Sequence, residues 1–162
     1  MEEGFIRDSK VCGFERMVLL RVRPGADLLA AIADGIRKHG IRSGVFVSGL
    51  GALQKAVLRN LRVFPASYPV QPEDRLYFTL EKPLELLGVS GWIGERADGT
   101  AEIHAHFSAS YADGDRVVGV GGHLTTGTIA AIKVVIAIAV LPPGSVGTAF
   151  DEESQSLDID LA

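Results

Sequence analysis

The sequence predicts a single α+β domain, and three observations support this prediction. One segment carries apolar residues at helical spacing, and several others alternate apolar and polar residues as strands do. The chain has 162 residues, of which 47% are hydrophobic, so it can bury a sizeable core. No linker or repeat divides it. We therefore expect one domain over residues 14–149, an N-terminal extension over 1–13, and an acidic C-terminal tail over 150–162 that is mobile and solvated.

The first two elements are a strand and a helix. Glu15–Arg23 alternates, and its apolar side chains share one face until Pro24-Gly25 ends the strand. Asp27 is placed to cap a helix that ends before Gly40, a residue type that favours the position just after a helix. The apolar stripe of this helix consists of Leu28, Leu29, Ile32 and Ile36.

The remaining elements are predicted to be strands. Gly49-Leu50-Gly51 is expected to form a turn, and 65–74, which contains three prolines, a surface loop. Asp98-Gly99 and Asp113-Gly114 are typical hairpin-turn sequences. The predicted strands are Gly44–Gly49, Lys55–Phe64, Leu84–Ile93, Ala101–Ser110, Val117–Val120 and Ile129–Leu141.

Charge and cysteine content limit the function classes. The formal net charge is −4, and five acids with no base lie from Asp151 onward, which leaves 16 basic and 15 acidic residues elsewhere. A nearly neutral domain argues against autonomous nucleic-acid binding, which needs many cations that neutralise phosphates. Cys12 is the single cysteine, the N-terminus has no apolar signal core, and Lys133 interrupts the longest apolar run. We therefore expect a cytoplasmic protein without a membrane segment.

The segment Ala101–Ser110 carries the candidate site. Strand side chains alternate, so Ala105 and Phe107 face the core while His104 and His106 share the opposite face. A third histidine, His123, follows two glycines, and a hairpin turn at Asp113-Gly114 would bring it beside the other two. Three neutral imidazoles can bind a zinc ion, or another divalent transition metal, and leave a fourth position open to water or a small ligand.

Other interpretations of these residues remain open. The histidines can instead form an exposed polar patch without a metal. Glu102, on the same strand face, is a weak candidate for a general base, or it is a solvated carboxylate. His39 follows the helix and suits the helix dipole, so we place it outside the site. Arg59 and Arg62 either contact an anionic ligand or are solvated surface side chains.

The order of several motifs resembles a known family. These motifs are Arg23-Pro24-Gly25-Ala26-Asp27, Val47-Ser48-Gly49-Leu50-Gly51, His104-Ala105-His106 and Gly119–Gly122 followed by His123-Leu124. From Phe14 to Leu141 the chain resembles the plant and prokaryote conserved (PPC) domain, of the prokaryotic type. The resemblance implies an α+β fold with a largely antiparallel (mixed) β-sheet flanked by helices. It also implies a homotrimer and a metal bound by His104, His106 and His123.

Plant members of that family carry AT-hooks with an Arg-Gly-Arg-Pro core, and the present sequence has none. The stretch that plant relatives use for partner binding is replaced by Ser90-Gly91-Trp92-Ile93-Gly94.

Three functions follow as hypotheses. The first is a trimeric metal-binding module with a small-molecule ligand; the second is a metal-dependent enzyme acting on a small polar substrate. The third, suggested by family analogy alone, is a DNA-associated or scaffold protein.

Overall fold

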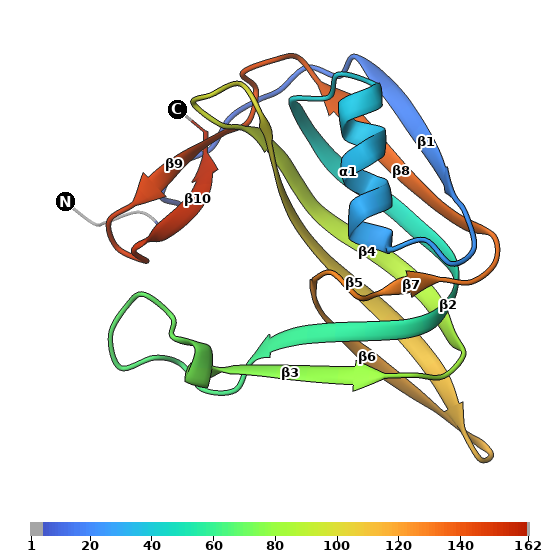
Figure 1. Cartoon of the computed structure of the whole chain (residues 1–162). Helices are drawn as coiled ribbons and strands as arrows, with labels where there is room; N and C mark the ends of the chain where they lie inside the picture. The colour runs from blue at the N-terminus through green and yellow to red at the C-terminus, as the bar shows by residue number, and fades with distance from the viewer. Residues whose placement is uncertain (1–4, 162) are drawn as a thin grey trace.

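The computed structural model, which describes residues 5–161, is one large β-sheet with a single α-helix packed against it (Figure 1). Of the predicted extension and tail, residues 1–4 and 162 lie outside the described residues. The helices are α1 (Leu28–Lys38) and a short 3-10 turn, η1 (Pro72–Asp74). The strands are β1 (Arg16–Val22), β2 (Ser43–Leu61), β3 (Arg75–Leu80), β4 (Leu84–Glu95), β5 (Ala101–Asp113), β6 (Arg116–Leu124), β7 (Ile129–Ala130), β8 (Val134–Leu141), β9 (Gly147–Asp151) and β10 (Ser156–Asp160).

The sheet is organised around the long strand β2. The strand order is β1-β8-β2-β6-β5-β4-β9-β10, and β3 and β7 also pair with β2. An additional pairing of β2 with β4 closes β2, β6, β5 and β4 into a circuit. The strand pairs are antiparallel except for one parallel contact between Glu95 and Gly147. The prediction of a largely antiparallel, mixed sheet is confirmed, but "flanked by helices" is wrong because residues 5–161 form one α-helix only.

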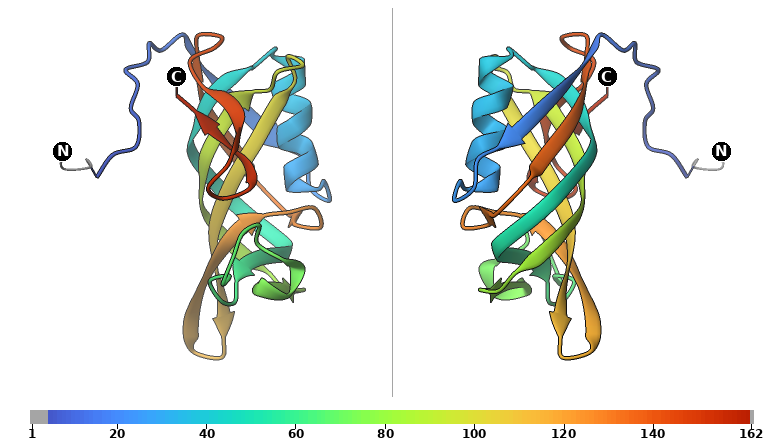
Figure 2. Two further views of the ribbon diagram at one scale, coloured as in Figure 1. Left: turned by 90° about the vertical axis from the view of Figure 1, so that its left-hand side faces the viewer. Right: turned by 90° about the vertical axis from the view of Figure 1, so that its right-hand side faces the viewer.

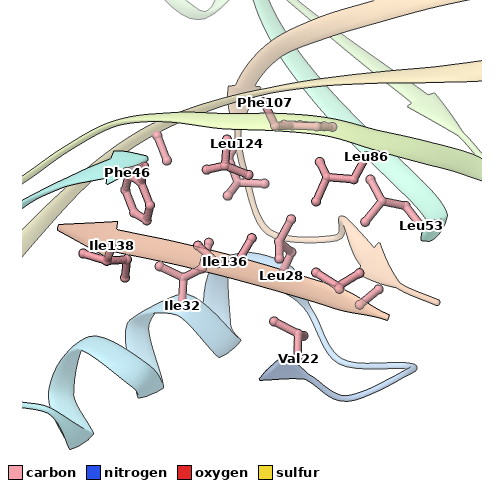
Figure 3. Packing of buried hydrophobic residues seen from close by; sticks show 14 of the residues in the cluster. Val22, Leu28, Ile32, Phe46, Leu53, Leu86, Phe107, Leu124, Ile136 and Ile138 are labelled. Carbon is pink, nitrogen blue, oxygen red and sulfur yellow. The ribbon is translucent and has the colours of Figure 1, made fainter. Parts of the chain in front are cut away.

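Helix α1 forms as its sequence predicts. The Asp27 carboxylate accepts a hydrogen bond of 2.9 Å from the Ala30 backbone N–H, which caps the first turn. Leu28, Ile32 and Ile36 are buried. Figure 3 shows Ile32 pointing toward the strand that carries Ile136, and these residues belong to the single core between helix and sheet. Within the described residues, no helix is long and apolar enough to cross a bilayer.

The opposite face of β1, β8 and β2 carries exposed apolar side chains. Alternation along β1 turns Val18, Leu20 and Val22 toward the core, and Met17, Leu19 and Arg21 to the opposite face. Because α1 is the one α-helix among residues 5–161, this outer face has no helix packed on it. Its exposed large hydrophobic residues are Met17, Leu19, Val45, Val47 and Leu50.

Two strand assignments from the sequence were wrong. Gly49-Leu50-Gly51 is not a turn, because β2 continues through it and Gly49 and Leu50 pair with β8. A strand can bend there because Gly51 has a φ of 137°, which suits glycine. Conversely, the predicted strand Ile129–Leu141 is interrupted by Lys133, whose φ of 54° lies in the left-handed region and separates β7 from β8.

The acidic C-terminal residues form a β-hairpin, which differs from the mobile tail that we expected. Strands β9 and β10 pair from Asp151 opposite Ser156 to Gly147 opposite Asp160. Asp151 is only 7% exposed, accepts a hydrogen bond from the Ser154 backbone N–H and forms an ion pair of 2.7 Å with Arg7. The hydrogen bonds from Ser154 and the ion pair with Arg7 hold the pKa of the Asp151 carboxyl well below its usual range.

Candidate metal centre

The β5–β6 hairpin brings the three predicted histidines together. Its turn at Gly114 (φ 59°) sets a register in which His106 lies directly opposite His123. This antiparallel hairpin extends beyond the body of the sheet (Figure 2). Ala105 and Phe107 point into the core, so His104 and His106 share the outer face, as the alternation predicted.

The imidazole nitrogens are close enough to share one ion. One ring nitrogen from each of the three histidines lies within 4.8 Å of the other two, and His104 Nε2 is 3.3 Å from His106 Nε2. The His104 and His106 rings are stacked, with an interplanar angle of 16°. The His123 ring is perpendicular to both, with centroid distances of 5.1 Å. The three imidazoles therefore converge from two strands on one point.

Trp92 on β4 supports the cluster and was not identified as a site residue from the sequence. It lies opposite His104 in the β4–β5 register, and its ring stacks on the His104 imidazole at 5.2 Å. The neighbouring Gly91 has a φ of 133°, and a Cβ there would lie 2.0 Å from the His104 carbonyl oxygen. Glycine is therefore required for β4 to approach β5 beside His104.

Burial keeps the imidazoles of His106 and His123 neutral, which is the form that binds metals. Partial burial lowers the pKa of His123 to about 4, with further lowering by the positive charge of Arg59. Burial also lowers the pKa of His106, and the neighbouring His104 and Arg59 add to this effect. At neutral pH both side chains can therefore offer a lone pair without first losing a proton.

Glu102 and His39 do not join the cluster. The Glu102 carboxylate is bound by the Arg96 guanidinium, whose Nε donates to it at 2.7 Å. The Glu102 carboxylate is therefore engaged by Arg96 and not by the histidines. His39 lies at the C-cap of α1, where its backbone N–H bonds to Gly35, outside the three-histidine group.

The histidines line a pocket of about 350 Å³ on the outer surface. Its other lining residues come from the second half of β2, the following loop and β3: Arg59, Asn60, Leu61, Val70 and Arg75. Arg59 was a candidate from the sequence, whereas Arg62 is not among the lining residues. Arg75 was not identified, because strand β3, which places it beside β2, had no clear alternation in the sequence.

Glycines also determine how closely β6 can approach its neighbours. A Cβ at Gly122 would lie 1.9 Å from the Asn60 side-chain oxygen, and one at Gly121 would lie 3.0 Å from the Phe107 carbonyl oxygen. The Asn60 amide also donates a hydrogen bond of 3.0 Å to the Gly121 carbonyl. The Gly-Gly-His sequence therefore places His123 by allowing strands β5 and β2 to approach on either side.

Comparisons with known proteins agree with this fold. The family model described as the Plants and Prokaryotes Conserved (PCC) domain matches residues 9–142. A metal-containing protein from Archaeoglobus fulgidus has a similar structure, with 27% identity, a TM-score of 0.69, and 91% of this chain and 96% of that chain covered. No curated protein matches the chain significantly.

Two further solved structures show the same fold. A plant- and prokaryote-conserved (PPC) protein from Pyrococcus horikoshii has 22% identity and a TM-score of 0.69 over 96% of this chain and 99% of that chain. A candidate DNA-binding protein from Bacteroides thetaiotaomicron has 15% identity and a TM-score of 0.70 over 93% and 97%. The match to the family model extends over most of the chain, from before β1 to the end of β8. The chain therefore belongs to the Plants and Prokaryotes Conserved domain family.

Proposed function

We propose that this protein is a metal-binding module in which His104, His106 and His123 hold one zinc ion. The observation that carries the proposal is the 3.3 Å separation of the His104 and His106 Nε2 atoms. Two nitrogens that bind zinc at ~2.0–2.1 Å with a tetrahedral angle lie roughly 3.3 Å apart. The pair is therefore already spaced as two ligands of one ion, and His123 closes the third side.

The donor set favours zinc among the divalent metals. Three imidazoles with no thiolate or carboxylate suit zinc, copper, nickel or iron, and zinc accepts a tetrahedral site with three protein ligands. The relative named as metal-containing supports a metal in this fold. In such a site the fourth position faces the pocket and is open to a small molecule or water.

The proposal includes a homotrimer. The number of three subunits comes from the family resemblance, and the outer sheet face supports an interface between copies. Leu19 on β1 and Val47 on β2 are 68% and 55% exposed there, on either side of β8. An apolar surface of this extent commonly marks a protein–protein interface. In the strand registers, Val45 lies opposite Trp92 and Trp92 opposite His104, so the apolar face is continuous with the metal centre.

The open coordination position also favours a second candidate, a metal-dependent enzyme that activates water. Zinc lowers the pKa of bound water to ~7 and so supplies a nucleophile. Glu102, the one carboxylate proposed to assist, is already bound by Arg96, so this function is the weaker candidate. A DNA-binding role, suggested by the names of two similar solved structures, is opposed by the net charge of −4.

Metal content of the untagged protein tests the proposal. We expect about one equivalent of zinc per chain after zinc loading and extensive dialysis. The double variant His104→Ala/His106→Ala should lose it, because one remaining imidazole binds zinc weakly. The matched control is His39→Ala, which removes the histidine at the end of α1 and should keep the full equivalent.

Two results would contradict the proposal. One is a wild-type protein that retains no metal after loading, although circular dichroism shows that it is folded. The other is a double variant that retains the same metal content as the wild type. Screening the zinc-loaded protein against small esters, amides and phosphoesters separates the enzyme from the binding module.

A further inference from the structure

The pocket in front of the three histidines has a strongly cationic wall. Arg59 lies opposite His123 in the β2–β6 register, so the two side chains share one face of the sheet. Arg75 lies opposite Leu61 in the β2–β3 register, two residues further along β2 from Arg59, and therefore on the same face. Both guanidiniums line the pocket with the three imidazoles.

No carboxylate balances this positive charge within the pocket. Its eight described lining residues are three histidines, two arginines, Asn60, Leu61 and Val70. The ion pairs of residues 5–161 involve neither Arg59 nor Arg75; Glu102, the acid nearest in sequence to the histidines, pairs with Arg96 instead. The one hydrogen bond of the Arg75 guanidinium goes to the Val70 carbonyl at 3.4 Å, which is long.

The guanidiniums of Arg59 and Arg75 face the same pocket as the three imidazoles. A divalent ion on the histidines would add two positive charges to a pocket that already carries two. Such a concentration of charge next to an open coordination position favours an anionic ligand over a neutral or cationic one.

We infer that the open position takes a small dicarboxylate ligand, with one carboxylate at the metal position and the other paired with the guanidiniums of Arg59 and Arg75. This inference rests on the proposed metal site. Planar guanidiniums match carboxylate geometry and can bind it in a bidentate manner. A carboxylate of an organic acid fits better than inorganic phosphate, because Leu61 and Val70 supply apolar wall for a short carbon chain. The volume of about 350 Å³ limits the ligand to a small molecule.

Titration of the zinc-loaded protein with succinate, succinamide and inorganic phosphate tests the inference. Succinamide has a similar size and shape to succinate but carries no charge. Calorimetry measures affinity, and fluorescence of Trp92, which stacks on His104, gives a second readout at the site. We expect saturable binding of succinate, none of succinamide, and weaker binding of phosphate.

The variants Arg59→Gln and Arg75→Gln, alone and combined, separate the anion site from the metal site. We expect the double variant to retain one equivalent of zinc and to lose at least about tenfold in succinate affinity, as two charge-assisted hydrogen bonds require. Arg62→Gln is the matched control, because this neighbouring arginine is exposed and does not line the pocket. It should leave succinate affinity unchanged.

Three results would overturn the inference. They are equal binding of succinate and succinamide, wild-type succinate affinity in the double arginine variant, and binding of phosphate without binding of succinate. If the wild type binds no zinc, the proposed metal-binding function is wrong, whatever the result for the anion pocket. Trp92 fluorescence of the metal-free protein, titrated with succinate, then tests the anion pocket alone. Arginine-dependent succinate binding in that sample would support the anion pocket, and its absence would overturn it.

Discussion

His106 and His123 face each other across the β5–β6 hairpin, with ring centroids 5.1 Å apart and planes nearly perpendicular. The hairpin register alone fixes this relationship, because the turn residues determine which side chains lie opposite. Two ligands of the proposed metal therefore depend on local pairing, and the third, His104, lies two residues from His106 on the same face. The centre requires no domain movement to assemble.

Zinc binding should stabilise the folded protein. A ligand that binds only the folded state at 100 times its Kd adds about 2.7 kcal/mol, which for a chain of this size corresponds to a rise in Tm of roughly 5–10 °C. Differential scanning fluorimetry with and without zinc measures this shift, and a chelator should reverse it. The double variant His104→Ala/His106→Ala should show no shift. An equal shift in that variant would mean that zinc stabilises the fold from another site.

The stability of the metal-free protein should fall as the pH falls from about 6.5 toward 4. The pKa of His123 is about 4 in the folded protein and 6.5 ordinarily, so in this interval the unfolded chain binds a proton that the folded chain does not. Above pH 6.5 this histidine contributes no pH dependence. Urea unfolding across the pH range should show a flatter profile for His123→Gln. His39→Gln is the control, and an equal flattening by it would contradict this assignment.

Gly91→Ala should destabilise the protein by at least about 1–3 kcal/mol, because it places a side chain at a left-handed φ and against the His104 carbonyl oxygen. It should also weaken zinc binding by displacing His104. The matched control is Gly119→Ala on β6, where an added Cβ would meet no atom within 4 Å. Urea unfolding and zinc competition measure the two effects. Equal stability of both variants would show that β4 does not approach β5 as described.

Arg7→Ala should loosen the C-terminal hairpin, because the Arg7 guanidinium is the ion-pair partner of the buried Asp151 carboxylate. Hydrogen exchange should increase over residues 147–160 and remain unchanged over α1. Arg16→Ala is the control, since that arginine pairs with the adjacent, exposed Glu15. Unchanged exchange in the hairpin of the Arg7 variant would mean that Ser154 alone holds Asp151.

The proposed trimer should dissociate when a charge is placed on the outer sheet face. Val47→Glu introduces a carboxylate at an apolar position that is 55% exposed in one chain, so it should leave the isolated chain folded. Light scattering after size exclusion should show a smaller particle than for the wild type. Val117→Glu, at an 80% exposed position in the β5–β6 hairpin, is the control. A Val47 variant that matches the wild type in mass would exclude this face as the interface.

The sequence could predict the elements whose residues interact locally. Asp27 caps α1 as expected, and the alternation around Ala105 and Phe107 correctly placed His104 and His106 on one face. The turn at Asp113-Gly114 also predicted that His123 would lie beside them, as the hairpin register confirms. In each case the residues that form the sequence pattern lie only a few positions, or one tight turn, from the residues that they contact.

What the sequence could not predict depends on partners far along the chain. The acidic segment forms a hairpin in which Arg7, from the other end of the chain, pairs with Asp151. Its turn carries no glycine signal, because Gln155 takes the left-handed φ of 50°. The break at Lys133 lies in a segment without glycine or proline, so only the backbone φ of 54° at Lys133 reveals it. Arg75 joins the pocket through strand pairing with β2, which no spacing indicates.

The central claim is that the three imidazoles bind one metal ion together, and X-ray absorption at the zinc edge of the loaded protein tests it most directly. We predict about three imidazole nitrogens at ~2.0–2.1 Å and one further light atom in the fourth position. The same measurement on His39→Ala should give an identical spectrum. A spectrum with a sulfur ligand, or with oxygen ligands and no imidazole scattering, would contradict the account.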